Sequence, residues 1–144
     1  MLETVGNKLK TEEKLNRFCQ NSLVGFLGIE ITDMGEHFVN GKMPVDERTK
    51  QPFGCLHGGA SLSLAETLAS IGAMQAVDSE NLFCVGLEIN ANHIKTVHEG
   101  YVYGKAEAVH LGKKTQVWSV RIVNDSDQLV CISRLTLAVL DKKQ

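Results

Sequence analysis

The stretch LHGGASLSLAETLASIGAMQAV, residues 56–77, decides the fold of this chain. It is made of small and apolar residues, it contains no proline, and Glu66 is the only charged residue within it. A run of this length and composition predicts one long helix from about residue 56 to residue 77. Its glycines and alanines permit the close approach of a curved sheet, which explains why a buried helix here is not made of leucine.

Glu66 is unusual because it stands alone among apolar neighbours in this helix. Ionised carboxylates are rarely fully buried unless they are paired, and carboxylates with perturbed ionisation concentrate at functional sites. An exposed helix face would normally carry several charges. We therefore interpret Glu66 as a buried functional acid, with a position on a solvated stripe as the alternative.

The glycine pair Gly58-Gly59 stands at the start of the same helix. A helix N-terminus offers unpaired N–H groups and a partial positive charge. With no side chain to obstruct approach, the N–H of Gly58 could stabilise a developing oxyanion. The alternative is that the glycines serve only for tight entry into the helix.

The rest of the chain is rich in β-forming residues. A short helix is predicted from the N-cap Thr11 to about Gln20, because two acids follow the threonine. Alternating or β-rich segments separated by turn residues predict about six strands, at residues 27–34, 37–45, 83–90, 100–109, 115–123 and 129–140. This order predicts an α+β domain in which a curved antiparallel sheet wraps the long helix.

Length and charge restrict the class of protein. A chain of 144 residues is expected to form one domain, 1–144, with residues 1–21 as an N-terminal extension carrying the short helix. The net charge of −2 argues against nucleic acid as the main ligand. The polar segment 1–10 lacks the apolar core of a signal peptide, so we expect a cytoplasmic protein that does not bind membranes.

The cysteines and histidines indicate neither a disulfide nor a metal site. Cys19, Cys55, Cys84 and Cys131 are far apart and form no C-x-x-C pair, so reduced thiols are expected. Cys55 lies two residues before a histidine, which suggests a thiol nucleophile, but we favour a packing role for it. The histidine spacings do not match a zinc site, and no metal or other cofactor is expected.

Short motifs extend over most of the chain from residue 22 onward. They are M-P-V-D at 43–46, R-T-K-Q-P-F-G at 48–54, L-H-G-G-A-S at 56–61, L-A-E at 64–66, V-G-L-E-I-N-A-N-H at 85–93, H-L-G at 110–112, Q-V-W at 116–118 and S-R-L-T at 133–136. With these motifs the chain resembles the hotdog-fold acyl-CoA thioesterases. Within that family it is similar to the 1,4-dihydroxy-2-naphthoyl-CoA thioesterases of menaquinone synthesis and to their proofreading relatives in siderophore pathways.

This resemblance implies thioester hydrolysis without a metal, a cofactor or a serine triad. It implies that Glu66 is the catalytic nucleophile or general base and that the Gly58 N–H polarises the thioester carbonyl. It further implies that Gln51 and His57 flank the carbonyl and that Ser70 places the water or the carboxylate. The residues expected to hold coenzyme A are Gly86, His93, Lys95, Thr96, His110, Gly112 and Lys113. The Lys95-Thr96 pair departs from the basic residue and serine of many relatives, but it preserves a charge and a hydroxyl.

Each of these residues also has a structural interpretation. Ser70 shares a helix face with Glu66 at i, i+4, yet its hydroxyl could instead bond to the i−4 carbonyl. His57 could brace the loop, and Gln51 could be an ordinary loop residue. Lysines at strand ends, such as Lys95 and Lys113, could meet phosphates or simply be solvated.

Other functions remain open at this point. The leading hypothesis is hydrolysis of an aromatic acyl-CoA. The alternatives are a hotdog hydratase or dehydratase acting on a hydroxyacyl thioester, a proofreading thioesterase acting on carrier-protein-linked aryl groups, and a non-catalytic acyl-CoA sensor.

The spacing of Gly58 and Glu66 predicts an oligomer. If the helix starts at Gly58, the eight residues to Glu66 span about 12 Å along its axis, and one carbonyl cannot touch both. We therefore expect a two-fold dimer in which each active site takes Gly58 from one subunit and Glu66 from its neighbour. A homotetramer, as a dimer of dimers, is the expected assembly.

Overall fold

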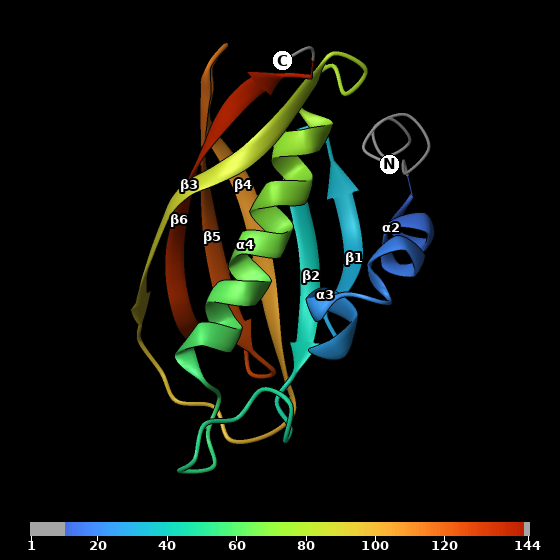
Figure 1. The fold of residues 1–144 in the computed structure, drawn as a ribbon. Helices are drawn as coiled ribbons and strands as arrows, with labels where there is room; N and C mark the ends of the chain where they lie inside the picture. The colour runs from blue at the N-terminus through green and yellow to red at the C-terminus, as the bar shows by residue number, and fades with distance from the viewer. Residues whose placement is uncertain (1–10, 143–144) are drawn as a thin grey trace.

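The computed structural model describes residues 11–142, in which one long helix packs against a curved six-stranded antiparallel sheet (Figure 1). The strands are arranged in the order β1-β2-β4-β5-β6-β3. The elements are α2 Glu12–Cys19, α3 Leu23–Phe26, β1 Glu30–Gly35, β2 Phe38–Pro44, α4 Gly58–Gln75, β3 Leu82–His93, β4 Tyr101–Leu111, β5 Thr115–Asn124 and β6 Leu129–Asp141. The predicted α+β architecture is confirmed, with α3 as an unpredicted addition. The start of the expected N-terminal extension, residues 1–10, lies outside the described residues.

Helix α4 lies close to the sheet because small residues line the contact. Its buried residues are Ala60, Ser61, Leu64, Ala65, Leu68, Ala69, Gly72 and Ala73. A Cβ atom on Gly72 would lie 2.6 Å from the Trp118 ring, and Cβ atoms on Gly41 and Gly104 of the sheet would lie 2.6 and 2.7 Å from Leu68. Glycines in the helix and in the sheet therefore both allow the predicted close approach. Truncating the fully buried Leu68 to alanine would cost about 2–5 kcal/mol of stability.

The prediction that Glu66 is buried is wrong for the single chain, where its side chain is exposed. Only one face of α4 is buried against the sheet, and Glu66 lies outside that face, at the side of the helix next to β3. The small residues around Glu66 in the sequence belong to the buried face, so they say little about the environment of its carboxylate. Composition identifies a helix that packs closely but does not assign each residue to a face.

The two edges of the sheet are built differently. The edge strand β1 lies beside α2, whose Asn16 side-chain amide donates to Ile31 O at 2.9 Å and accepts from Ile31 N at 2.8 Å. The other edge strand, β3, pairs with β6 on one side, and no strand of residues 11–142 pairs with its other side. Leu87 in β3 is 61 % exposed. The sheet therefore has one covered edge and one open edge.

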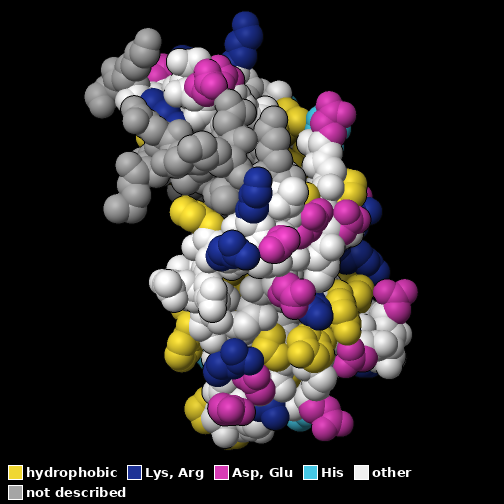
Figure 2. Space-filling model, turned by 90° about the vertical axis from the view of Figure 1, so that its right-hand side faces the viewer, with side chains coloured by type: hydrophobic (Ala, Val, Ile, Leu, Met, Phe, Trp, Pro, Cys, Tyr) yellow, Lys and Arg dark blue, Asp and Glu magenta, His cyan; other side chains and the backbone are white. Residues whose placement is uncertain are grey.

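The N-terminal helix α2 begins as predicted at Thr11, whose hydroxyl oxygen accepts from Lys14 N at 3.4 Å. Leu15 is its buried residue and attaches α2 to the core. Charged side chains of both signs are spread over this side of the molecule (Figure 2). Among residues 11–142, the structure contains no helix with the length and apolar character needed to span a membrane.

Candidate active site

A cavity of about 260 Å³ opens where the loop 51–57 meets the start of α4 and the end of β3. The lining includes five residues that the sequence nominated, namely Gln51, Gly58, His93, Lys95 and Thr96. The remaining lining residues are Cys55, Leu56, Ser61, Ile94 and Val130. The five nominated residues, which are up to 45 positions apart in the chain, thus meet at one end of the sheet.

Helix α4 begins at Gly58, and His57 is its N-cap. The His57 Nδ1 accepts from Gly59 N at 2.8 Å, so this nitrogen carries no proton and the neutral ring bears its proton on Nε2. The Gly58 N–H has no acceptor within residues 11–142, as expected for the first residue of a helix. His57 thus braces the helix start and leaves the Gly58 donor available.

The Gly58 backbone lies against the His93 ring. A Cβ atom on Gly58 would lie 2.8 Å from His93 Nε2, so glycine is what allows this close approach. The arrangement brings a backbone donor and an ionisable ring to the same wall of the cavity. The backbone donor at this wall is suited to an acyl oxygen that gains negative charge.

Glu66 is in the middle of helix α4, and its carboxylate lies against strand β3. A Cβ atom on Gly86 would come within 2.8 Å of Glu66 Oε1, so Gly86 makes room for this carboxylate. The resemblance implied contact between Gly86 and coenzyme A, whereas in the single chain its neighbour is Glu66. Gly86 therefore lies next to Glu66 and not next to the residues that line the cavity.

Ser70 is one turn beyond Glu66 on the outward face of α4. Two other hydroxyls of this helix, on Ser63 and Thr67, donate to the i−4 carbonyls at 2.9 and 2.7 Å. Ser70 makes no such bond within the described part of the chain. Its hydroxyl is therefore free to act on a group next to Glu66.

Apart from His57, the helix cap, the nominated residues fall into three groups in one chain. The first group lines the cavity by Gly58, and the second consists of Glu66, Ser70 and Gly86. The third, His110, Gly112 and Lys113, lies at or beside the turn between β4 and β5. The end of β5 next to this turn pairs with β6 at Ala138, while β3 pairs with β6 at Cys131 where it enters the cavity. The third group is therefore at the opposite end of the sheet from the first.

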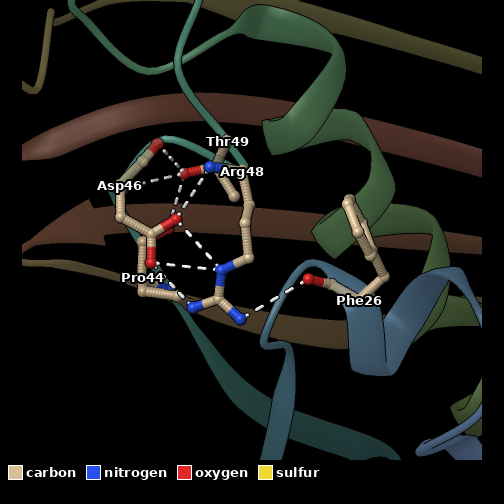
Figure 3. A network of polar contacts seen from close by, with 5 residues as sticks. All are labelled: Phe26, Pro44, Asp46, Arg48 and Thr49. Carbon is tan, nitrogen blue, oxygen red and sulfur yellow. Dashed lines mark hydrogen bonds and ion pairs between the residues drawn. The ribbon is translucent and has the colours of Figure 1, made fainter.

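A polar network that the sequence analysis did not identify holds the loop before the cavity (Figure 3). The Arg48 guanidinium binds the Asp46 carboxylate, with the shortest contact at 2.7 Å, and reaches Phe26 O at 3.4 Å. These hydrogen bonds lower the pKa of Asp46. Thr49 donates to Pro44 O at 2.7 Å. The Asp-x-Arg spacing was the one available signal for this network.

The same network leads to the helix start. Thr49 O accepts from His57 N at 2.8 Å, so the loop that Arg48 and Asp46 hold also fixes the N-cap of α4. Helix α3, which supplies the Phe26 carbonyl, is thereby connected to the cavity.

Among residues 11–142, no group of three or more histidine, cysteine or acidic side chains is arranged to hold a metal ion.

Comparison with known proteins identifies the family. The sequence profile of the Thioesterase superfamily matches residues 53–131, which include the whole of α4 with Glu66 and the strands β3, β4 and β5. The chain belongs to the thioesterase superfamily. A thioesterase from Haemophilus influenzae has a superposable structure, with a TM-score of 0.91 and 45 % identity over 100 % of this chain and 98 % of that one. The predicted hotdog fold is thereby confirmed.

Two similar proteins carry names that state an activity. The 1,4-dihydroxy-2-naphthoyl-CoA hydrolase of Escherichia coli is 46 % identical over 90 % of this chain and 95 % of its own length. The proofreading thioesterase EntH of Cronobacter turicensis is 44 % identical over 90 % of this chain and 94 % of its own. The chain is therefore a thioesterase, and of the two names only that of the E. coli protein states a substrate.

A third comparison bears on two residues. A Staphylococcus aureus protein, 41 % identical over 81–83 % of this chain, has been solved with a glutamate replaced by alanine and, separately, with a glutamine replaced by alanine. The structures superpose with TM-scores of 0.81 and 0.79. The two altered positions are fifteen residues apart in that protein, as Gln51 and Glu66 are here.

Proposed function

We propose that this thioesterase hydrolyses an aromatic acyl-CoA, and that its physiological substrate is 1,4-dihydroxy-2-naphthoyl-CoA. The observation that carries the proposal is the free N–H of Gly58 in a cavity shared with Gln51, on the same helix as the exposed carboxylate of Glu66. A donor for the oxyanion and a carboxylate that acts as nucleophile or base are two groups that thioester hydrolysis can use. The name of the E. coli relative supports the choice of acyl group.

The proposed reaction uses each residue in a defined step. The thioester carbonyl accepts a hydrogen bond from Gly58 N–H, which stabilises the negative oxygen formed on attack by about 2.7–4 kcal/mol. Glu66 removes a proton from a water that attacks the carbonyl carbon, or it attacks the carbon itself to form an anhydride that water then cleaves. The C–S bond breaks, coenzyme A leaves as a thiolate that takes up a proton, and the free acid remains.

We propose further that each active site is shared by two subunits. Because α4 begins at Gly58, Glu66 lies about 12 Å further along the axis, too far for one carbonyl to reach both. Antiparallel pairing of the open β3 edges about a two-fold axis would place the end of one sheet beside the opposite end of the other. That operation would bring His110, Gly112 and Lys113 of one subunit toward Lys95 and Thr96 of the other, where coenzyme A would bind.

The dimers are proposed to associate further into a homotetramer. The sheet face that points away from α4 carries exposed apolar side chains, among them Tyr101, Tyr103 and Ile132. These three side chains are 40–46 % exposed in the single chain. Their burial would favour a second contact between dimers.

A panel of thioesters tests the substrate. We expect kcat/KM for 1,4-dihydroxy-2-naphthoyl-CoA and benzoyl-CoA to exceed that for short aliphatic acyl-CoA by at least about tenfold, measured by release of free thiol. An aryl group on a carrier protein tests the proofreading role suggested by the C. turicensis relative. A higher kcat/KM for the carrier-linked substrate would replace our assignment by that one, and absence of thiol release from every substrate would refute the proposed hydrolysis.

Mixing two inactive variants tests the shared site. Glu66→Ala removes the carboxylate. Gly58→Pro removes the N–H at a helix position that tolerates proline, and its Cβ also displaces the His93 ring from the same site. Heterodimers should regain activity, because one of their two sites combines the intact Gly58 with the intact Glu66. No recovery despite demonstrated subunit exchange would show that each chain carries a complete site.

A further inference from the structure

The loop before the helix forms a tight turn around Gln51. Gln51 N donates to Cys55 O at 2.8 Å, and Gly54 N donates to Gln51 O at 2.9 Å. Gly54 has a φ of 84°, a backbone conformation that favours glycine. The turn therefore sets the backbone of Gln51 and Cys55 side by side at the mouth of the cavity.

The Gln51 side-chain amide is held at both ends within this turn. Its Oε1 accepts from Phe53 N, and its Nε2 donates to Cys55 Sγ at 2.7 Å. A backbone N–H can only donate, so the amide atom facing Phe53 has to be the oxygen. The nitrogen is consequently on the side of Cys55 and of the cavity that both residues line.

We propose that Cys55 is a positioning residue for thioester hydrolysis, which acts through Gln51. A glutamine Nε2 carries two N–H groups. Cys55 Sγ accepts one of them and holds the amide so that the second N–H points to the thioester carbonyl bound beside Gly58. This inference rests on the proposed function, and it gives Cys55 a polar role in place of the packing role that the sequence favoured.

The other thiols do not share this position. Cys84 Sγ contacts Ala73 O at 3.5 Å, and burial raises the pKa of Cys84 to about 11. Cys131 is buried in the core, and Cys19 is in α2. Of the four cysteines, all of which are in the described part of the chain, Cys55 alone lines the cavity and contacts a side chain proposed for catalysis.

Kinetics of Cys55 variants test the inference. Cys55→Val keeps the shape and removes the acceptor, so kcat should fall by about 3- to 10-fold, the effect of one hydrogen bond, while KM changes little. Cys55→Ser keeps an acceptor and should retain more than half of kcat. Cys19→Val, which removes a thiol far from the cavity, is the matched control. An unchanged kcat in Cys55→Val would overturn the proposal.

A double-mutant cycle separates positioning from a general effect on the loop. In a Gln51→Ala background, Cys55→Val should have no further effect on kcat, because the group it positions is gone. An equal loss in both backgrounds would refute action through Gln51. If Gln51→Ala itself leaves kcat unchanged, Gln51 takes no part in catalysis, and the proposed roles of both residues fall.

A measurement without turnover distinguishes this inference from the proposed function. The side-chain NH₂ of Gln51 should be rigid on the ps–ns timescale in ¹⁵N relaxation of the wild-type protein and more mobile in Cys55→Val. Equal mobility in the two proteins would overturn the positioning role even if hydrolysis is demonstrated. Increased mobility in Cys55→Val would support it even if the substrate assignment fails.

Discussion

The two edges of the sheet have the same local irregularity but opposite surroundings. Both edge strands contain a bulge, at Thr32 in β1 and at Leu87 in β3. The bulged residue is polar at the β1 edge, where Asn16 satisfies the backbone of Ile31, and apolar at the β3 edge, where no element within residues 11–142 covers the strand. In Figure 1, α2 lies beside β1 on one side and β3 forms the opposite margin.

This difference shows which edge of the sheet is covered within one subunit and which edge is left available for another chain. An exposed strand edge is a template for pairing with another chain, and proteins normally cover it or charge it. The β1 edge is protected in this way. The β3 edge is long and exposes the apolar side chains of Val85 and Leu87, and the same strand carries Gly86 against Glu66 and His93 against Gly58. The open edge and the candidate active site are thus the same region of the molecule.

The largest effect is expected from the carboxylate beside the open edge. Glu66→Gln should lower kcat by about 10²-fold or more, because it removes the nucleophile or base while keeping the shape. Glu30→Gln on the β1 side, an exposed acid paired with Lys42, is the control and should leave kcat unchanged. Steady-state kinetics with benzoyl-CoA measure both variants, and more than half of wild-type kcat in Glu66→Gln would contradict the catalytic role.

A charge placed on each edge compares the two directly. Leu87→Lys should raise the Kd of the dimer at least about tenfold, because two desolvated lysines would face each other across the β3 edges, and activity should then depend on protein concentration. Thr32→Lys places the same charge on the bulge of the protected edge. It should change neither the Kd of the dimer nor the dependence of activity on protein concentration. Analytical ultracentrifugation measures the Kd of the dimer, and activity assays at the same protein concentrations accompany it. An intact dimer in Leu87→Lys would mean that the subunits do not meet at the β3 edge.

A smaller effect is expected where the far end of the sheet would meet coenzyme A. Lys113→Glu should raise KM for acyl-CoA a few-fold with little change in kcat, since binding to the nucleotide phosphates is uniform through the reaction. Added salt should raise KM in the wild type and less in the variant, because exposed charge contacts are screened. Identical KM values across the salt series would exclude this site for the nucleotide.

The smallest effect on activity is expected at the protected edge. Asn16→Ala leaves Ile31 N and O without their partner, so the free energy of unfolding should fall by about 1–3 kcal/mol, as measured by urea denaturation. The kcat of the folded enzyme should not change. A loss of kcat at full stability would give the β1 side a functional part that the comparison of the edges does not predict.

Local pattern in the sequence predicted most of the fold. The proline-free run gave α4 within two residues at each end, and the alternation of apolar residues gave the six strands. The residue motifs indicated the thioesterase family and nominated Gln51, Gly58, His93, Lys95 and Thr96, which the structure gathers around one cavity. Helix propensity, strand alternation and turn chemistry depend on near neighbours in the chain, so one sequence is enough to identify them.

Tertiary structure alone decided which residues meet. It put Glu66 at the side of α4 next to Gly86 of β3, used the His57 ring as a cap, and turned the Gln51 amide toward Cys55. It also set Lys113 at the end of the sheet opposite Lys95. These facts depend on strand register and on which helix face packs, and both are fixed by contacts between residues far apart in the sequence. A pattern of neighbouring residues in the sequence does not record such long-range contacts, so it could not predict them.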